Sequence, residues 1–258
     1  MYLCTKNFTK RPFSTEKMQE TTIFLVLMCI GAAFVQRVSG FGFGIFIMTV
    51  LPYLMPSYGE ATTLSGLCAL SMGVFISIKY WKYLKWNKLW FLMIVFLISS
   101  FFAVHFVSQA GDGLLKTFLG IMLIIASLWF FLLAGKVHLK PNKPTQTILG
   151  TLSGIMGGLF GMQGPPAVLY FVETTETKEE YMAIAQTYFL IGNVMMTIYR
   201  AYYGFLTTTV LTDYCIGIFG VIIGSVLGSY AFKKMSLPIL RKIIYAYMAI
   251  SGIICLVN

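Results

Sequence analysis

Two glycine-rich segments of this sequence have the composition of a main-chain anion site. Residues 39–44 read Ser-Gly-Phe-Gly-Phe-Gly, and residues 157–166 combine four glycines with a Met-Gln pair and two adjacent prolines. Glycine permits positive φ and close backbone approach, while proline removes a donor and disfavours helix for the residue before it. Helices that begin at such breaks expose N–H groups at the positive end of their dipole. The two segments therefore predict a binding site for a small anion.

The main chain of the two breaks supplies most of the predicted substrate-binding residues. These are Ser39, Gly40, Gly42, Gly44, Gly161, Gln163 and Gly164. The alternative is that the glycines let helices pack closely or simply kink them. The recurrence of two breaks at matching places in the chain favours the binding site.

Three polar side chains in other apolar positions complete the candidate site. Arg37 lies three residues before the first break, and its planar fork of donors suits a sulfonate or a carboxylate. Its alternative role is to reach an interface or to pair with a helix C-terminus. Gln186 and Asn193 lie two helical turns apart on about the same face, where their amides either line a pathway or bond another helix.

Two further groups are candidates for a proton relay. They are His105, which would otherwise donate a hydrogen bond between packed helices, and Asp213, close to the start of an apolar block. Arg200 lies near the end of a block and is expected to be an interfacial anchor.

The elements that position these residues are those of a polytopic, all-α membrane protein. Of the 258 residues, 58% are hydrophobic and only 11% are charged, whereas a soluble domain carries about 25% charged residues. Single membrane-spanning helices are predicted at roughly 60–79, 88–107, 113–134, 181–203, 208–232 and 239–257. The blocks at about 21–55 and 147–172 hold the glycine breaks and predict broken helices.

The order of these blocks occurs twice. A basic N-terminal tail (1–20) precedes the first repeat (21–134), and a basic linker (135–146) precedes the second (147–258). Each predicted repeat is a broken helix followed by three spans, which is typical of secondary transporters. Broken segments that cross once make the repeats parallel, and hairpins make them inverted. The Lys and Arg count does not decide, but the first broken segment, 35 residues long, favours hairpins.

The net charge of +10 lies mainly in the tail and in short loops between apolar blocks, so a nucleic-acid partner is not expected. Such loops face the cytoplasmic leaflet, which predicts a multi-pass protein of the cell inner (cytoplasmic) membrane. Five scattered cysteines and two histidines favour neither a disulfide framework nor a metal site, and no cofactor is expected. The tail is interpreted as uncleaved, because the apolar run after it exceeds a signal-peptide core.

Residues 40–44, followed by Leu51-Pro52-Tyr53-Leu54, together with residues 157–170, resemble the paired motifs of the TauE/SafE sulfite exporter family. The resemblance covers nearly the whole chain after residue 20. It implies a carrier for sulfur-containing anions such as sulfite, thiosulfate or organosulfonates, with two interrupted helices that approach the substrate. Met162-Gln163 stands where the family often has a small residue and glycine, which bears on the anion that is bound.

A passive anion channel and a non-transporting membrane assembly or sensor protein are the alternative functions. An intramembrane enzyme is disfavoured, because the sequence has no G-x-S-x-G motif and no pair of embedded aspartates. The expected partners are the anion and the lipid bilayer. Coupling to protons or another ion, and assembly as a homodimer, stay open.

Overall fold

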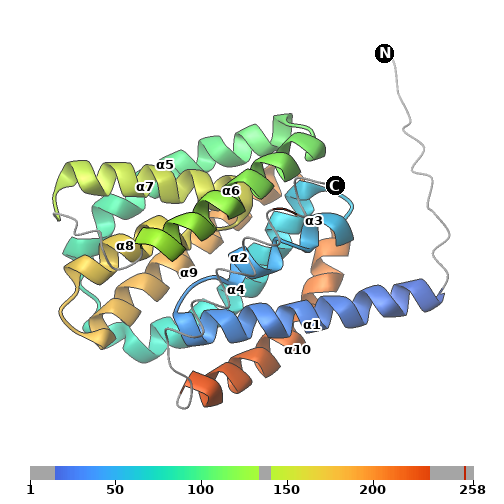
Figure 1. Cartoon of the computed structure of the whole chain (residues 1–258), viewed down its shortest axis with the longest axis horizontal. Coiled ribbons are helices and arrows are strands. Elements are labelled where there is room, and N and C mark those ends of the chain that lie inside the picture. Colours follow the sequence, from blue (N-terminus) through green and yellow to red (C-terminus); the bar gives the residue numbers. More distant parts are fainter. Residues whose placement is uncertain (1–14, 134–140, 233–252, 254–258) are drawn as a thin grey trace.

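The computed structural model describes residues 15–133, 141–232 and 253, and these residues form helices joined by short connections (Figure 1). The helices are α1 (Thr15–Ser39), α2 (Phe43–Ile47), α3 (Leu51–Leu54), α4 (Tyr58–Tyr80), η1 (Trp81–Tyr83), α5 (Trp86–Gln109), α6 (Asp112–Leu133), α7 (Lys143–Phe160), α8 (Gly164–Thr174), α9 (Lys178–Tyr202) and α10 (Thr208–Phe232). No β-strand occurs in these residues. The predicted all-helical class is confirmed.

Five helices, α1, α4, α5, α9 and α10, are long and apolar enough to cross a membrane. Their outer surfaces are apolar: Ile98 and Phe102 on α5 and Phe219 and Val226 on α10 are each more than half exposed. Soluble proteins rarely expose such patches, so the chain is a multi-pass membrane protein. Five predicted spans correspond to α4, α5, α6, α9 and α10. The span predicted at 239–257 lies outside the described residues, apart from residue 253.

The chain doubles back at each of the two breaks. In the first broken segment, a Cβ on Gly31 of α1 would lie 2.8 Å from the ring of Phe46 on α2, so α2 returns along α1. On the second, Gln146 Nε2 at the start of α7 donates to Tyr170 Oη near the end of α8 at 2.6 Å. These contacts fit the hairpin interpretation of both broken segments.

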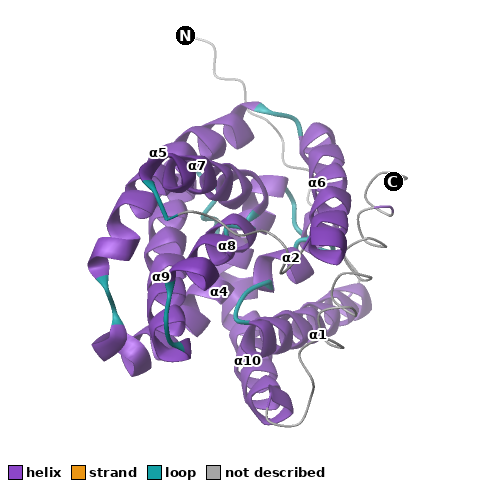
Figure 2. Ribbon diagram, turned by 60° about the vertical axis from the view of Figure 1, so that its left-hand side comes forward, coloured by secondary structure: helices purple, strands orange, loops and turns teal. Residues whose placement is uncertain are grey.

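The two hairpins are held in matching ways. Helix α10 packs along α1 and α5 packs along α7, while α4 and α9 pack against each other. Figure 2 shows α2 and α8 near the centre of the bundle, with α5 and α7 above them and α1 and α10 below. The first arm of each hairpin, α1 or α7, is thus covered by a helix from the other half of the chain.

Glycines make these two helix pairs close. The ridge of Gly220, Gly224 and Gly228 on α10 faces α1, and the ridge of Gly150, Gly154 and Gly158 on α7 faces α5. A Cβ at Gly154 would lie 2.7 Å from the carbonyl oxygen of Phe96, and one at Gly224 would overlap that of Ile30. Both ridges therefore let two helices pack closely together.

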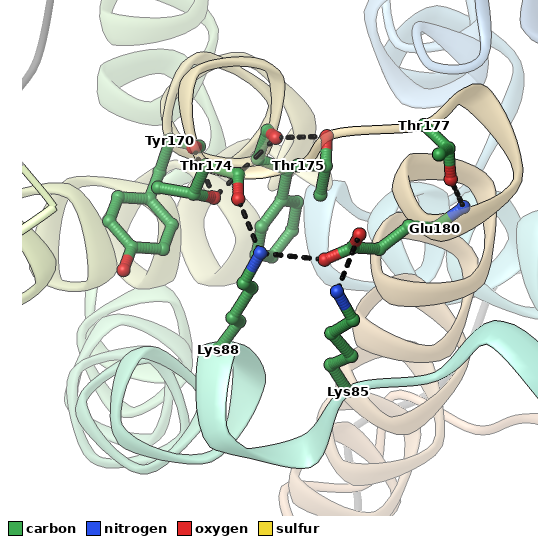
Figure 3. A network of polar contacts seen from close by, with 8 residues as sticks. Lys85, Lys88, Tyr170, Thr174, Thr175, Thr177 and Glu180 are labelled. Atoms are coloured by element: carbon green, nitrogen blue, oxygen red, sulfur yellow. Dashed lines mark hydrogen bonds and ion pairs between the residues drawn. The ribbon is translucent and has the colours of Figure 1, made fainter.

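One end of the bundle is fastened by ion pairs, shown in Figure 3. Glu180, at the start of α9 and only 3% exposed, pairs with Lys85 Nζ at 3.1 Å and with Lys88 Nζ at 2.7 Å. Lys88 Nζ also donates to the carbonyl oxygen of Thr174 at the end of α8. The hydrogen bond from Lys85 to Glu180 raises the pKa of that lysine. We call this end, which also carries Lys79, Lys82 and Lys143, the lysine end.

We expect Gly224→Ala to destabilise the protein, because the added methyl has no room against the backbone of α1. Overpacking of this kind costs about 1–3 kcal/mol. The matched control is Gly113→Ala on α6, where a Cβ meets nothing within 4 Å. Thermal unfolding of the purified protein in detergent measures both variants. Equal unfolding temperatures would show that α1 and α10 do not depend on this close contact.

Candidate functional site

The two glycine breaks meet around one small cavity. Its volume is about 30 Å³, and its lining comes from the end of α1, both breaks, α4 and α9. The lining residues are Gln36, Phe41, Gly42, Phe43, Gly44, Ile45, Ala69, Gly161, Met162, Gln163, Gly164, Pro165, Phe189 and Asn193. None of them is acidic. Segments about 120 residues apart in sequence thus form one enclosure.

The first break is shaped by two glycines and held by two glutamines. Gly40 and Gly42 have φ of 84° and 106°, a region that side chains rarely adopt. The N–H of Phe43 donates to Gln36 Oε1 at 3.2 Å, and Gln186 Nε2 on α9 donates to the carbonyl oxygen of Gly40 at 3.1 Å. The break is therefore fastened both to its own helix and to α9.

The second break ends α7 at a left-handed glycine. Gly161 has φ of 68°, its N–H donates to Gly157, and the N–H of Met162 reaches back to the carbonyl oxygen of Met156 at 3.1 Å. Pro165 then sits in the first turn of α8, where a missing N–H breaks no helical bond. The reversal thus follows from the glycine and the prolines of the sequence.

Gln163 joins the second break to α9 and to the interior of α7. Its Nε2 donates to the carbonyl oxygen of Phe189 at 3.2 Å, which fixes the orientation of the amide because a carbonyl only accepts. Its Oε1 is buried without a hydrogen-bond partner among the described residues. A Cβ on Gly192 would overlap this oxygen, so only glycine at that position leaves room for the side chain.

The two breaks touch through their main chains. A Cβ on Gly44 would overlap the carbonyl oxygen of Gly161, and one on Gly164 would lie 3.3 Å from Phe41. In the first turns of α2 and α8 the N–H groups have no helical partner. Pro165 and Pro166 carry no N–H, so Gly164 is the main donor of the second break. Few, fixed main-chain donors, around a cavity whose described lining holds no carboxylate, suit a small anion.

Arg200 was expected to be an interfacial anchor, and this prediction is wrong. Its side chain is 1% exposed. One terminal nitrogen donates to the carbonyl oxygen of Thr62 on α4 and the other to Gly157 and Gly158, at 3.0–3.3 Å. It makes no ion pair among the described residues. The guanidinium is instead placed at the negative end of the α7 dipole.

Arg200 also lies beside Asn193, which lines the cavity. A Cβ on Gly66 of α4 would be 3.2 Å from a terminal nitrogen of Arg200 and 3.9 Å from Asn193 Oδ1. The sequence signal for this group is a spacing of seven: Gln186, Asn193 and Arg200 follow one another at two-turn intervals on α9. Gln36 was missed as well, since a glutamine beside an arginine carries no pattern of its own.

Six of the predicted residues do not line this cavity. Arg37 lies outside it and donates from Nε to Ser229 Oγ on α10 at 2.7 Å. His105 is exposed, with its Nδ1 2.9 Å from Tyr203 Oη, and Asp213 is half-buried on the first turns of α10. The side chain of Ser39 is outside the described residues. Gly40 and Gln186 lie behind the lining and hold it in place.

Comparison with known proteins agrees with the resemblance seen in the sequence. The family model described as "Sulfite exporter TauE/SafE" matches residues 24–254. The probable sulfite/organosulfonate exporter TauE of Cupriavidus necator is 23% identical over 197 residues, which cover 75% of this chain and 77% of that protein. No solved structure matches.

Replacing Arg200 tests its structural role. Arg200→Gln leaves carbonyl oxygens of α4 and α7 without their donor, at a cost of about 1–3 kcal/mol for each buried group. Arg200→Lys keeps the charge but loses the fork, so we expect an intermediate unfolding temperature. Lys82→Gln, at an exposed position, is the control. If Arg200→Gln unfolds at the temperature of this control, the guanidinium does not fasten the second hairpin.

Proposed function

Because the chain belongs to the sulfite exporter TauE/SafE family, we propose that it is a secondary transporter of a small sulfur-containing anion: sulfite, thiosulfate or an organosulfonate. The proposed binding site is the cavity between the two breaks. The family description and the name of the Cupriavidus necator relative support the substrate class. The proposed location is the cytoplasmic membrane.

The charge balance around the cavity carries this proposal. The lining supplies main-chain donors and the amides of Gln163 and Asn193, and it includes no carboxylate. The buried charge beside it is the guanidinium of Arg200, whose partners are neutral carbonyl groups. A buried cation without a counter-ion favours entry of an anion and disfavours a cation.

The size of the cavity favours a carrier over an open channel. About 30 Å³ is room for roughly two or three water molecules, whereas sulfite has four non-hydrogen atoms and a sulfonate has more. A substrate must therefore separate the two breaks as it enters. The hairpins overlap there, so movement of either one opens the cavity toward one end of the bundle, as alternating access requires.

The lysine end is proposed to face the cytoplasm. It carries Lys79, Lys82, Lys85, Lys88 and Lys143, whereas Lys17 and Lys116, at the starts of α1 and α6, are at the opposite end of the bundle. Lysines and arginines accumulate in cytoplasmic loops. With a hairpin and three crossings in the first repeat, the second hairpin then enters from the cytoplasmic side and the first from the opposite side.

Loss of an amide from the cavity is expected to slow transport. Gln163→Ala and Asn193→Ala each remove a polar group from the lining, and a lost hydrogen bond to a charged partner costs about 1.5–3 kcal/mol, or about tenfold or more. Gln109→Ala, at the exposed end of α5, is the control. Initial rates of radiolabelled sulfite uptake into proteoliposomes report the effect. Rates equal to wild type in both cavity variants would exclude this cavity as the site.

The same proteoliposomes distinguish a carrier from a channel and identify the anion. We expect uptake above the external concentration that collapses when an ionophore removes the ion gradients. Sulfite, thiosulfate, sulfoacetate and taurine are compared with simple carboxylates as competitors. Uptake that only equilibrates, whatever gradient is imposed, would assign a passive channel.

A further inference from the structure

A second, larger cavity lies away from the proposed transport site. It is a groove of about 730 Å³ between α4 and α10, closed at one end by Arg37 of α1. Ile222 and Val226 on its rim are more than half exposed, so the groove opens on the outer surface of the bundle. It runs from Tyr214 to Ser229, about 22 Å along α10 at 1.5 Å per residue. This is somewhat longer than one hydrocarbon leaflet of about 15 Å.

The two ends of the groove differ in chemistry. Its walls are apolar, with Leu70, Val74, Ile218 and Val221 among them. At the far end, Ser71 Oγ and Tyr214 Oη hydrogen-bond to each other at 2.6 Å and are therefore satisfied. The near end has two cations, Arg37 and Lys79. The groove thus combines a long apolar channel with a positively charged mouth.

Arg37 has binding capacity to spare. Among the described residues, Arg37 uses one of its five N–H donors, for Ser229 Oγ, and makes no ion pair. The guanidinium fork matches the oxygens of a phosphate. Lys79, at the end of α4, lies at the same mouth and adds a second positive charge. An arginine at such a position is costly unless an anion accompanies it.

The remaining sequence of this chain does not supply that anion. Residues 233–258 contain no Asp or Glu, but they contain Lys233, Lys234, Arg241 and Lys242. A small inorganic anion would satisfy the mouth and leave the apolar walls unfilled. A ligand that has both an anionic head and a long apolar tail matches both parts of the groove.

We propose that this groove binds an anionic phospholipid, with its phosphate at Arg37 and Lys79 and one acyl chain along α4 and α10. The mouth is at the lysine end, which suits the anionic lipids of the cytoplasmic leaflet. Because α1 is the first arm of a hairpin, a bound lipid would brace the helix that carries the first break. The lipid site does not depend on which anion the protein transports.

Native mass spectrometry of the full chain in detergent tests the site, with dioleoyl phosphatidylglycerol and dioleoyl phosphatidylcholine as probes. Wild type is expected to retain phosphatidylglycerol in preference to phosphatidylcholine. Arg37→Gln and Lys79→Gln should each weaken phosphatidylglycerol binding by about fivefold. Lys82→Gln makes the same charge change outside the groove and should bind as wild type does. Lys79 and Lys82 are both exposed, so this pair of variants remains informative if Arg37→Gln does not fold.

Two further experiments distinguish a lipid from other occupants of the groove. Glycerol 3-phosphate carries the head without the tail and should not displace the lipid. Val226→Trp, which narrows the groove without changing charge, should weaken lipid binding. Equal retention of the two lipids, displacement by glycerol 3-phosphate, or equal effects of Lys79→Gln and Lys82→Gln would each overturn the proposal. Retention of neither lipid by wild type would overturn it too, and would leave the groove to another part of the chain.

Discussion

The structure depends on hydrogen-bond partners for the backbone N–H and C=O groups at the two places where a helix is interrupted inside the membrane protein. An unpaired carbonyl or N–H in hydrocarbon costs several kcal/mol, so a break survives only where other groups supply partners. Helix α9 supplies them to both hairpins. Gln186 donates to Gly40 in the first break, and Arg200 donates to Gly157 and Gly158 in the second. The cavity lies between these two points of attachment, on the face of α9 that carries Asn193.

The direct contact of the two breaks gives the site its mechanical character. Since Gly44 and Gly161 touch through the backbone, neither hairpin can shift without the other responding. Close-packed interfaces of this kind have discrete arrangements and do not deform continuously. A small cavity with few fixed donors is consistent with the proposed carrier, which must change shape to admit each anion.

The sequence was sufficient for the five single spans that the structure describes and for the two breaks, because both follow from local composition. Long apolar runs and clusters of glycine and proline have local physical causes that need no tertiary information. The side chains were harder to assign. Of the two arginines considered, Arg37 is in the deeper apolar run and Arg200 near a span end, yet Arg200 is the one buried beside the cavity. Burial of a side chain depends on which helix faces it, here α4 with Gly66, and that pairing is not local.

Helix α1 packs on α10 and helix α7 packs on α5, so each pair joins the two halves of the chain. This arrangement has a consequence for assembly in the cell. The ridge of Gly220, Gly224 and Gly228 that receives α1 is synthesised long after α1 itself, whereas α5 is already present when α7 emerges. The second hairpin can therefore dock on α5 as soon as it leaves the ribosome, while the first waits until α10 has been made. During that interval only lipid, the insertion machinery or a chaperone can cover the face of α1 that later contacts α10. Assembly of this protein should accordingly be most vulnerable in the interval between the synthesis of α1 and the synthesis of α10.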